Sequence, residues 1–119
     1  MWVFSDVGFF SVVEDWTDKD FVWVRTRWRK DLEQLREYLK SKKVEFIIDR
    51  ILETPNRDYA FRIHIEKNDW DMILSYLGQD IRYGNFKEAI QDKDPEREKL
   101  YHRVWHIMRA AEKKDGYCE

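Results

Sequence analysis

The chain has 119 residues, of which 43% are hydrophobic and 16% aromatic, and its 22 basic and 24 acidic side chains give a formal net charge of −2. These values favour one globular domain over residues 1–119 and exclude a disordered chain or a globally basic nucleic-acid binder, so nucleic-acid binding would need a local patch. The single cysteine, Cys118, excludes an internal disulfide framework, and a reducing cytoplasm is the expected location.

No processing signal is recognisable in the chain. The N-terminus lacks the basic start and the continuous apolar stretch of a signal peptide, and no later segment has the roughly 18 apolar residues that a membrane span needs. We therefore expect a soluble, unprocessed protein without membrane contact, whose last residues, from about 115 to 119, fray.

Short runs rich in Val, Phe and Trp predict three strands in the first third of the chain. Turn-forming segments separate these runs, which cover residues 1–4, 8–15 and 21–28. Leucines at helical spacing then predict an amphipathic helix over residues 31–43, with Asp31 and Gln34 in the positions of a capping box.

Residues 44–54 and 59–67 return to strand character, with a turn between them. In the second of these strands, the alternation predicts one face in the core and one in water. The core face would carry Tyr59, Phe61, Ile63 and Ile65, and the wet face would carry Ala60, Arg62, His64 and Glu66.

Capping signals mark three helices in the remainder of the chain. Asn68 is suited to cap a helix that ends at Gly78, and Asn85 is suited to cap a short helix. Asp94 and Pro95 predict the start of a long last helix, whose apolar stripe contains Leu100, Val104, Ile107, Met108 and Ala111. The order of elements predicts an α+β fold, an antiparallel sheet of about five strands with two to four helices packed mainly on one face.

The segment WVRTRWRK holds the main candidate surface. In an extended strand, one face of this segment carries Trp23, Arg25, Arg27 and Arg29. Guanidinium groups bind phosphate in a bidentate way and tryptophan stacks on bases, so this face would bind a nucleotide or nucleic acid, with Arg62 and His64 extending it. The alternative is that the arginines form cross-strand salt bridges with acidic residues, namely Glu14, Glu45, Asp49 or Glu66.

A second candidate surface surrounds the start of the short helix, in the segment DIRYGNFKEAI. Helix N-termini favour anions, so Arg82, Tyr83 and Lys87 are candidate residues for a ligand or a partner. The alternative is an ordinary capped turn, because Asn85 and Glu88 have the spacing of a capping box.

Glu98, His102 and His106 recur every four residues on the last predicted helix and form a candidate metal site. The segment is not the HExxH motif of metalloproteases, and the same residues fit a solvated helix face, so we expect neither a metal nor another cofactor. A separate acidic set would suit Mg²⁺ and hydrolysis; it comprises Asp49, Glu53, Asp58, Asp69 and Asp71.

Several segments of the chain also carry a resemblance. They are MWVF with GFFSVVED, VRTR with the following DLEQL, ETPNRDYAFRI, YGNFKEAI and YHRVW. Together they resemble a small family of bacterial and phage proteins of about this length, without an established activity. The resemblance implies a cytoplasmic bacterial or phage protein and directs attention to Asp58, Tyr59, Arg62, Tyr83, Asn85, Phe86, Lys87, Tyr101 and Trp105.

The first functional hypothesis is a small cytoplasmic, non-catalytic binding protein that acts on a protein partner or on a second copy of itself, because Trp, Tyr and Arg are abundant and dominate interface hot spots. In a phage setting, such a protein would be an inhibitor or a host-modulating factor. The alternatives are a nucleotide or nucleic-acid binding module that uses the arginine and aromatic face, and a metal-dependent hydrolase.

Overall fold

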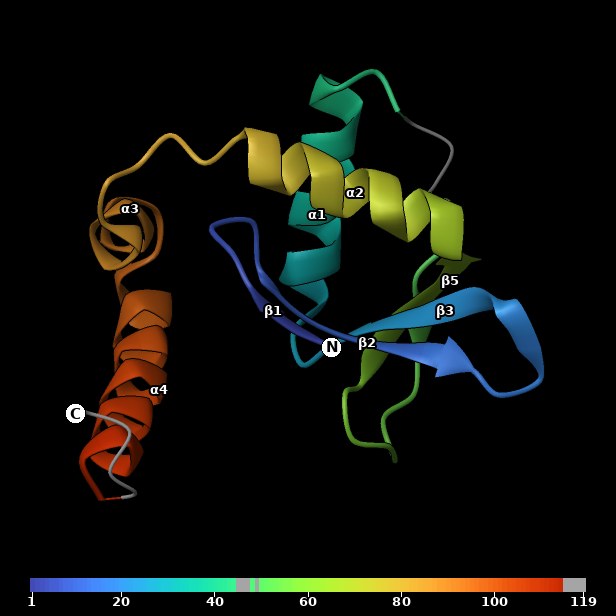
Figure 1. Ribbon diagram of the computed structural model, residues 1–119. Coiled ribbons are helices and arrows are strands. Elements are labelled where there is room, and N and C mark those ends of the chain that lie inside the picture. Colours follow the sequence, from blue (N-terminus) through green and yellow to red (C-terminus); the bar gives the residue numbers. More distant parts are fainter. Residues whose placement is uncertain (45–47, 49, 115–119) are drawn as a thin grey trace. The chain divides into compact units, whose positions relative to one another are not determined.

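Five strands form one antiparallel sheet in the computed structural model, which describes residues 1–44, 48 and 50–114 (Figure 1). The strand order across the sheet is β1-β2-β3-β5-β4. The bounds are Trp2–Phe4 for β1, Phe9–Asp15 for β2, Asp18–Thr26 for β3, Leu52–Glu53 for β4 and Phe61–Glu66 for β5. The predicted antiparallel sheet is confirmed. In the described part of 44–54, however, β4 is the only strand and is much shorter than predicted.

Two helices cover one face of this sheet (Figure 1). α1 spans Arg29–Ser41 and α2 spans Lys67–Gln79. Their apolar side chains pack against alternate residues of β2, β3 and β5, since successive strand residues point to opposite faces. The buried cluster includes Phe10, Val12, Val22, Val24, Leu32, Leu35, Leu39, Ile63, Ile65, Trp70 and Ile73. The predicted α+β class is therefore confirmed.

The chain divides into two compact units, Met1–Ile81 and Arg82–Glu119. The first unit holds the sheet with α1 and α2. The second holds α3, which spans Phe86–Lys93, and α4, which spans Pro95–Lys114. These two helices meet through stacked rings of Phe86 and Tyr101, whose centroids are 5.6 Å apart. A single domain over the whole chain stays a prediction. None of the described helices is long and apolar enough to cross a membrane.

The predicted caps of α3 and α4 are confirmed. The Asn85 side chain accepts a hydrogen bond from the Glu88 N–H at 3.1 Å. The Asp94 carboxylate accepts one from the Arg97 N–H at 3.1 Å. Each bond satisfies an amide group that a helix start leaves free, so both starts follow from residues within one turn.

The predicted capping box at Asp31 is wrong. α1 has Trp28 as its N-cap, and Asp31 lies fully buried inside the first turn. Its carboxylate accepts a hydrogen bond from the Phe9 N–H of β2 at 3.0 Å, so a long-range contact replaces the local one. Gly8 allows this close approach, because a Cβ atom there would lie 2.9 Å from the Cβ and Cγ atoms of Asp31.

The predicted bounds of α2 are also wrong. The helix starts before Asn68 and runs through Gly78, which therefore does not end it. Asp80 follows the helix and ties its end to α1, since the Asp80 carboxylate accepts a hydrogen bond from the Tyr38 hydroxyl at 2.5 Å. Burial, together with this carboxylate, raises the pKa of the Tyr38 hydroxyl. A side-chain contact thus joins the end of α2 to α1.

Candidate anion-binding site on the open face of the sheet

The face of the sheet opposite α1 and α2, termed the open face, is organised by the strand register. Trp2 pairs with Ser11, Ser11 pairs with Arg25, and Arg25 pairs with Arg62. Residues paired across neighbouring strands point to the same face of a sheet. These four residues therefore form one row across β1, β2, β3 and β5, termed the arginine row.

An aromatic row adjoins the arginine row along the strands. Trp23 of β3 pairs with His64 of β5, and the His64 ring lies between those of Trp23 and Phe21, with centroid distances of 4.5 and 4.7 Å. The Nε2 atom of His64 is 2.7 Å from the Asp15 carboxylate. Hydrogen bonds from Thr17, and then the contact with His64, lower the pKa of the Asp15 carboxyl. The His64 ring is thus held in place by two rings and one carboxylate.

Arg62 carries a buried guanidinium group that has no counter-charge among the described residues. Only 7% of the residue is exposed, and no carboxylate among the described residues lies within 4.0 Å of its nitrogen atoms. Its Nη2 donates to the carbonyl oxygens of Tyr59 and Asp58 at 3.3 and 3.4 Å, and its Nε has no partner in the described part of the chain. Burial, followed by the charges of Arg57 and Arg25, lowers the pKa of this group. Among the described residues, these two long hydrogen bonds replace only part of the hydration that the buried charge has lost.

Arg25 is oriented by Ser11 and Tyr59. Its Nη2 donates to the Ser11 hydroxyl at 2.7 Å, and its guanidinium carbon lies 4.7 Å from the centroid of the Tyr59 ring. Arg27, just after β3, lies 4.4 Å from the same centroid. Contact with one aromatic ring thus holds two cations near each other although their charges repel.

Among the described residues, Tyr59 contacts two arginines, Arg25 and Arg27, and one of them has a counter-charge. Asp58 forms a salt bridge with Arg27, with a nitrogen-to-oxygen distance of 2.8 Å. Among the residues that the structure describes, neither Arg25 nor Arg62 has such a bridge. Guanidinium groups bind oxyanions well, because the fork of N–H donors matches the oxygen atoms of phosphate or carboxylate. The open face is therefore a candidate anion-binding site.

The register brings together four residues that the sequence indicated, namely Trp23, Arg25, Arg62 and His64. Arg62 is buried rather than wet, which corrects the predicted alternation. The turn at Asp58 and Tyr59 makes the difference, because its carbonyl oxygens lie against the guanidinium group. Arg29 lies outside the row, in the first turn of α1, where its Nε is 4.0 Å from Glu33.

Of the four acidic residues in the salt-bridge alternative, the two that the structure describes, Glu14 and Glu66, do not pair with Arg25 or Arg62. Glu14 pairs instead with Lys67 at the start of α2. Glu66 lies opposite Phe21 and makes no described ion pair with either arginine. The other two acidic candidates lie outside the described residues; they are Glu45 and Asp49.

The position of Tyr59 in the site differs from the one that the alternation of residues 59–67 predicts. The sequence predicts its ring in the core, whereas the ring lies under Arg25 and Arg27 and also contacts Phe9, with centroids 6.4 Å apart. Its backbone has a φ of 62°, so it does not continue the pleat of β5. The turn-forming residues before it, PNRD, were the signal that the strand pattern does not extend to this position.

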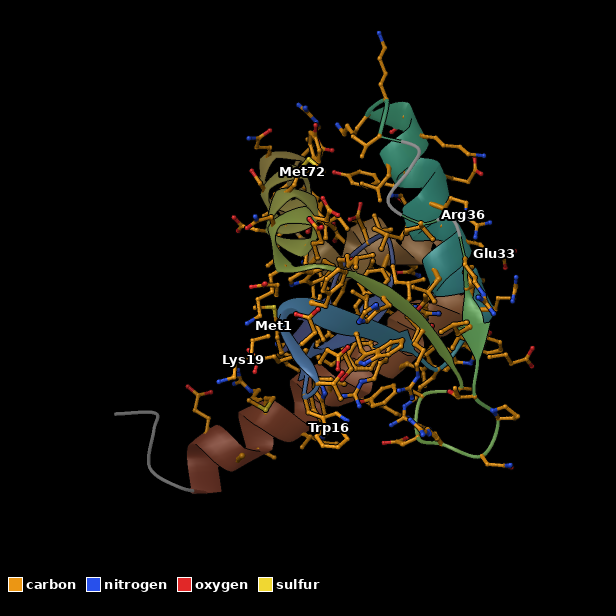
Figure 2. The ribbon with its side chains drawn as sticks, turned by 90° about the vertical axis from the view of Figure 1, so that its right-hand side faces the viewer. Met1, Trp16, Lys19, Glu33, Arg36 and Met72 are labelled. Atoms are coloured by element: carbon orange, nitrogen blue, oxygen red, sulfur yellow. The ribbon has the colours of Figure 1, made fainter. Side chains whose placement is uncertain are left out.

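Two tryptophans of the first unit are strongly exposed. Trp2, at the end of the arginine row, is 67% exposed. Trp16, at the turn between β2 and β3 and labelled in Figure 2, is 91% exposed. The Trp2 ring meets the Phe9 ring at 80°, with centroids 6.1 Å apart. Exposed indole rings are stacking surfaces for planar groups, so Trp2 adds such a surface to the row.

Arg82, Tyr83 and Lys87 belong to the second unit. The Tyr83 ring contacts that of Phe86, with centroids 5.7 Å apart. The Nζ atom of Lys87 lies 4.2 Å from the centroid of the Trp105 ring. Lys87 therefore contacts an aromatic ring of α4, which is a structural role within this unit.

The candidate metal residues Glu98, His102 and His106 are not arranged as a metal site. The His102 and His106 rings both contact Trp105, with centroid distances of 5.4 and 6.5 Å. Among the described residues, no group of three or more His, Cys, Asp or Glu side chains is placed to hold a metal ion. This finding covers four members of the acidic set, and Asp49 lies outside the described residues.

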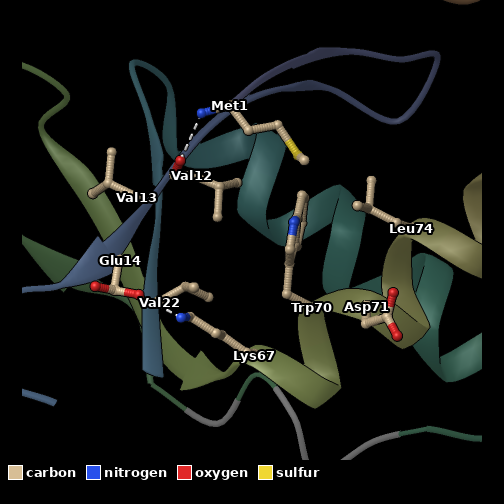
Figure 3. Close-up of a pocket in the computed structure, with 9 residues that line it drawn as sticks. All are labelled: Met1, Val12, Val13, Glu14, Val22, Lys67, Trp70, Asp71 and Leu74. Carbon is tan, nitrogen blue, oxygen red and sulfur yellow. Dashed lines mark hydrogen bonds and ion pairs between the residues drawn. The ribbon is translucent and has the colours of Figure 1, made fainter. Parts of the chain in front are cut away.

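A hollow of about 350 Å³ lies between β2 and α2 (Figure 3). Three charged groups at its rim have partners, because Glu14 pairs with Lys67 and the N-terminal ammonium donates to the Val12 carbonyl oxygen at 2.9 Å. Asp71 adds a fourth charged group. The Trp70 indole N–H has no partner among the described residues. The rest of the lining is mostly apolar; it includes Met1, Val13, Val22 and Leu74. The hollow therefore suits an apolar group, whereas the open face suits an anion.

Comparisons of this chain with protein-family models, with curated proteins and with solved structures find no match. The resemblance to a family of bacterial and phage proteins therefore stays a prediction.

Proposed function

We propose that the protein is a non-catalytic binding protein whose ligand carries an oxyanion, the phosphate of a nucleotide or nucleic acid, bound by Arg25 and Arg62 on the open face. The supporting observation is the buried guanidinium group of Arg62 opposite Arg25, with no carboxylate of the described residues within 4.0 Å of either group. Two such groups repel each other, and a bound anion would offset both charges.

The burial of the Arg62 charge supports a ligand role for this pair. A buried charge without a partner destabilises the folded state, and apolar side chains often replace such groups without loss of stability. Arg62 instead contacts the Trp23 ring, at 5.8 Å from guanidinium carbon to centroid, and two weakly placed carbonyl oxygens. An oxyanion would supply the strong hydrogen bonds that these neighbours do not.

Calorimetric titration with inorganic phosphate and with a nucleoside monophosphate, at low salt, tests the proposal. We expect the protein to bind, and we expect Arg25→Met and Arg62→Met each to weaken binding by roughly tenfold or more. Arg29→Met is the matched control, because it removes the same charge from α1, outside the arginine row. An equal loss in this control, or no binding by the unmodified protein, would contradict the proposal.

A protein partner is the second candidate, and the surface of α4 favours it. Within the second unit, α3 leaves much of the apolar stripe uncovered, since Leu100 and Val104 are 41% and 38% exposed and Ile107 and Met108 are each 66% exposed. The 4-3 spacing of Leu100, Val104 and Ile107 is typical of a seam between paired helices. The partner would be another protein or a second copy, and an inhibitor or host-modulating factor would act through this surface.

Ile107→Glu tests this second candidate. The substitution places a charge in the apolar stripe at an exposed position, so we expect it to abolish self-association in sedimentation experiments or to abolish capture of a partner protein. Arg103→Gln is the matched control, because it changes the charge of α4 by the same amount. Equal behaviour of the two variants would remove α4 as the binding surface.

A further inference from the structure

We infer that the ligand of the open face is single-stranded nucleic acid. The inference rests on the proposed function and adds bases to the phosphate that the arginines would bind. Aromatic rings adjoin Arg25 and Arg62 in two directions. Trp2 lies toward β1 within the arginine row, and the aromatic row lies along β3 and β5.

Trp2 offers a stacking surface beside the phosphate site. It pairs with Ser11, whose hydroxyl accepts a hydrogen bond from the Arg25 guanidinium at 2.7 Å. The Arg25 guanidinium group therefore lies over β2, the strand that neighbours Trp2 of β1. Neighbouring strands are only about 4.8 Å apart. Because Trp2 is 67% exposed, its indole ring can stack on a base whose phosphate contacts Arg25.

The aromatic row offers a second stacking surface, along β3 and β5. Trp23 and His64 precede and follow the two arginines by two residues in their strands, which is roughly 6.6 Å along the pleat. The Arg62 guanidinium carbon is 5.8 Å from the Trp23 centroid, and Trp23, His64 and Phe21 form a continuous series of ring contacts. A bound phosphate would thus have a ring near it in each direction, as successive nucleotides of one strand require.

The form of the site favours a strand over a free nucleotide or a duplex. Free nucleotides usually bind in concave pockets that enclose most of the ligand, whereas Trp2 and His64 are exposed on the face of a sheet. A duplex keeps its bases stacked on one another, so it would present phosphates and leave these rings without bases. A single strand presents phosphates and unstacked bases together, and aromatic side chains on sheets bind it in this way.

Fluorescence polarisation of a labelled, short single-stranded oligothymidylate tests the inference, with the matching duplex and inorganic tripolyphosphate as competitors. We expect the single strand to bind roughly tenfold more tightly than either competitor. Arg62→Met should weaken binding of the single strand and of tripolyphosphate. Trp2→Ala should weaken binding of the single strand by roughly tenfold and leave tripolyphosphate unaffected, whereas Trp16→Ala, which removes an exposed ring from a turn outside the row, should change neither.

The outcomes separate this inference from the proposed function. Tripolyphosphate binding that depends on Arg62, combined with single-strand binding that is no tighter or does not depend on Trp2, would overturn the inference and leave the proposed function in place. If none of the probes shows binding that depends on Arg62, both are overturned. Trp2→Phe guards against a folding artefact, because it keeps an aromatic ring and should retain most of the single-strand affinity, and circular dichroism of each variant verifies its fold.

Discussion

Arg62 differs from Arg27 in how its charge is accommodated. The Arg27 side chain is 48% exposed and pairs with Asp58, whereas Arg62 is buried against the Trp23 ring and two carbonyl oxygens. A buried charge with poor partners lowers the free energy of unfolding, and its replacement by an apolar side chain often restores it. If the group serves a ligand, substitution should therefore move stability and binding in opposite directions.

Arg62→Met is expected to leave the free energy of unfolding unchanged or to raise it by about 1–4 kcal/mol, because the buried charge disappears while most of the packing volume remains. Urea unfolding followed by circular dichroism measures this effect. Arg27→Met is the control, and its exposed ion pair should change stability by no more than about 1 kcal/mol. A loss of several kcal/mol in the Arg62 variant would mean that the guanidinium group holds the fold together.

Asp15→Asn is expected to destabilise the protein in a pH-dependent way. Hydrogen bonds from Thr17, and then the contact with His64, hold the folded-state pKa of Asp15 below its ordinary value of 3.8. The ionised carboxylate therefore contributes stability above about pH 4, and this contribution is lost as pH falls through the lower folded-state pKa. Urea unfolding of both proteins across that range should show a difference at neutral pH that shrinks in acid.

Asp20→Asn provides the comparison for this titration, since Asp20 is exposed on β3. Its stability difference from the unmodified protein should stay small and flat with pH. If the Asp15 variant showed the same flat difference, the hydrogen bonds from Thr17 and His64 would contribute nothing to folding.

Among the elements, the sequence predicted correctly what local contacts decide. Asn85 and Asp94 cap α3 and α4 as expected, because a cap depends on residues within one turn. Asp31 is the same kind of residue at a helix start, yet it binds the Phe9 amide of β2, which no local pattern can indicate. β4 pairs with β5 only at Leu52 and Glu53, and the local pattern did not indicate this short length either.

Gly8→Ala is expected to lower the free energy of unfolding by about 1–3 kcal/mol. The new Cβ atom would lie 2.9 Å from two atoms of the buried Asp31 side chain. Asp31 must then shift, which weakens the hydrogen bond that its carboxylate accepts from the Phe9 N–H. Gly84→Ala is the matched control, because nothing lies within 4 Å of a Cβ atom there. Urea unfolding should rank the Gly8 variant well below the Gly84 variant, and equal stabilities would disprove the close contact.

At the scale of the whole molecule, the sequence predicted each of the two strands of the candidate site but not how they pair. Strand alternation alone placed Trp23 with Arg25, and Arg62 with His64, on common faces. It could not place the two pairs opposite each other, because the register between β3 and β5 depends on contacts between segments far apart in the chain. The burial of Arg62 could not be predicted from the strand pattern either, because it depends on the turn at Tyr59, where φ is 62°.

A fragment of residues 1–81 is expected to fold by itself and to bind the same ligand as the full chain. The whole buried cluster of the sheet lies within these residues, and so does the arginine row. The complementary fragment, 82–119, is shorter than the roughly 40 residues below which domains seldom fold without added staples or partners, so it should be largely unfolded alone.

Circular dichroism and urea unfolding of the two fragments test this expectation, and oligonucleotide titration of the fragment 1–81 extends it to function. Arg82, Tyr83 and Lys87 are absent from that fragment, so full affinity would show that they are not part of the anion site. A folded fragment with much weaker binding would instead show that these three residues, or another part of the second unit, contribute to ligand binding.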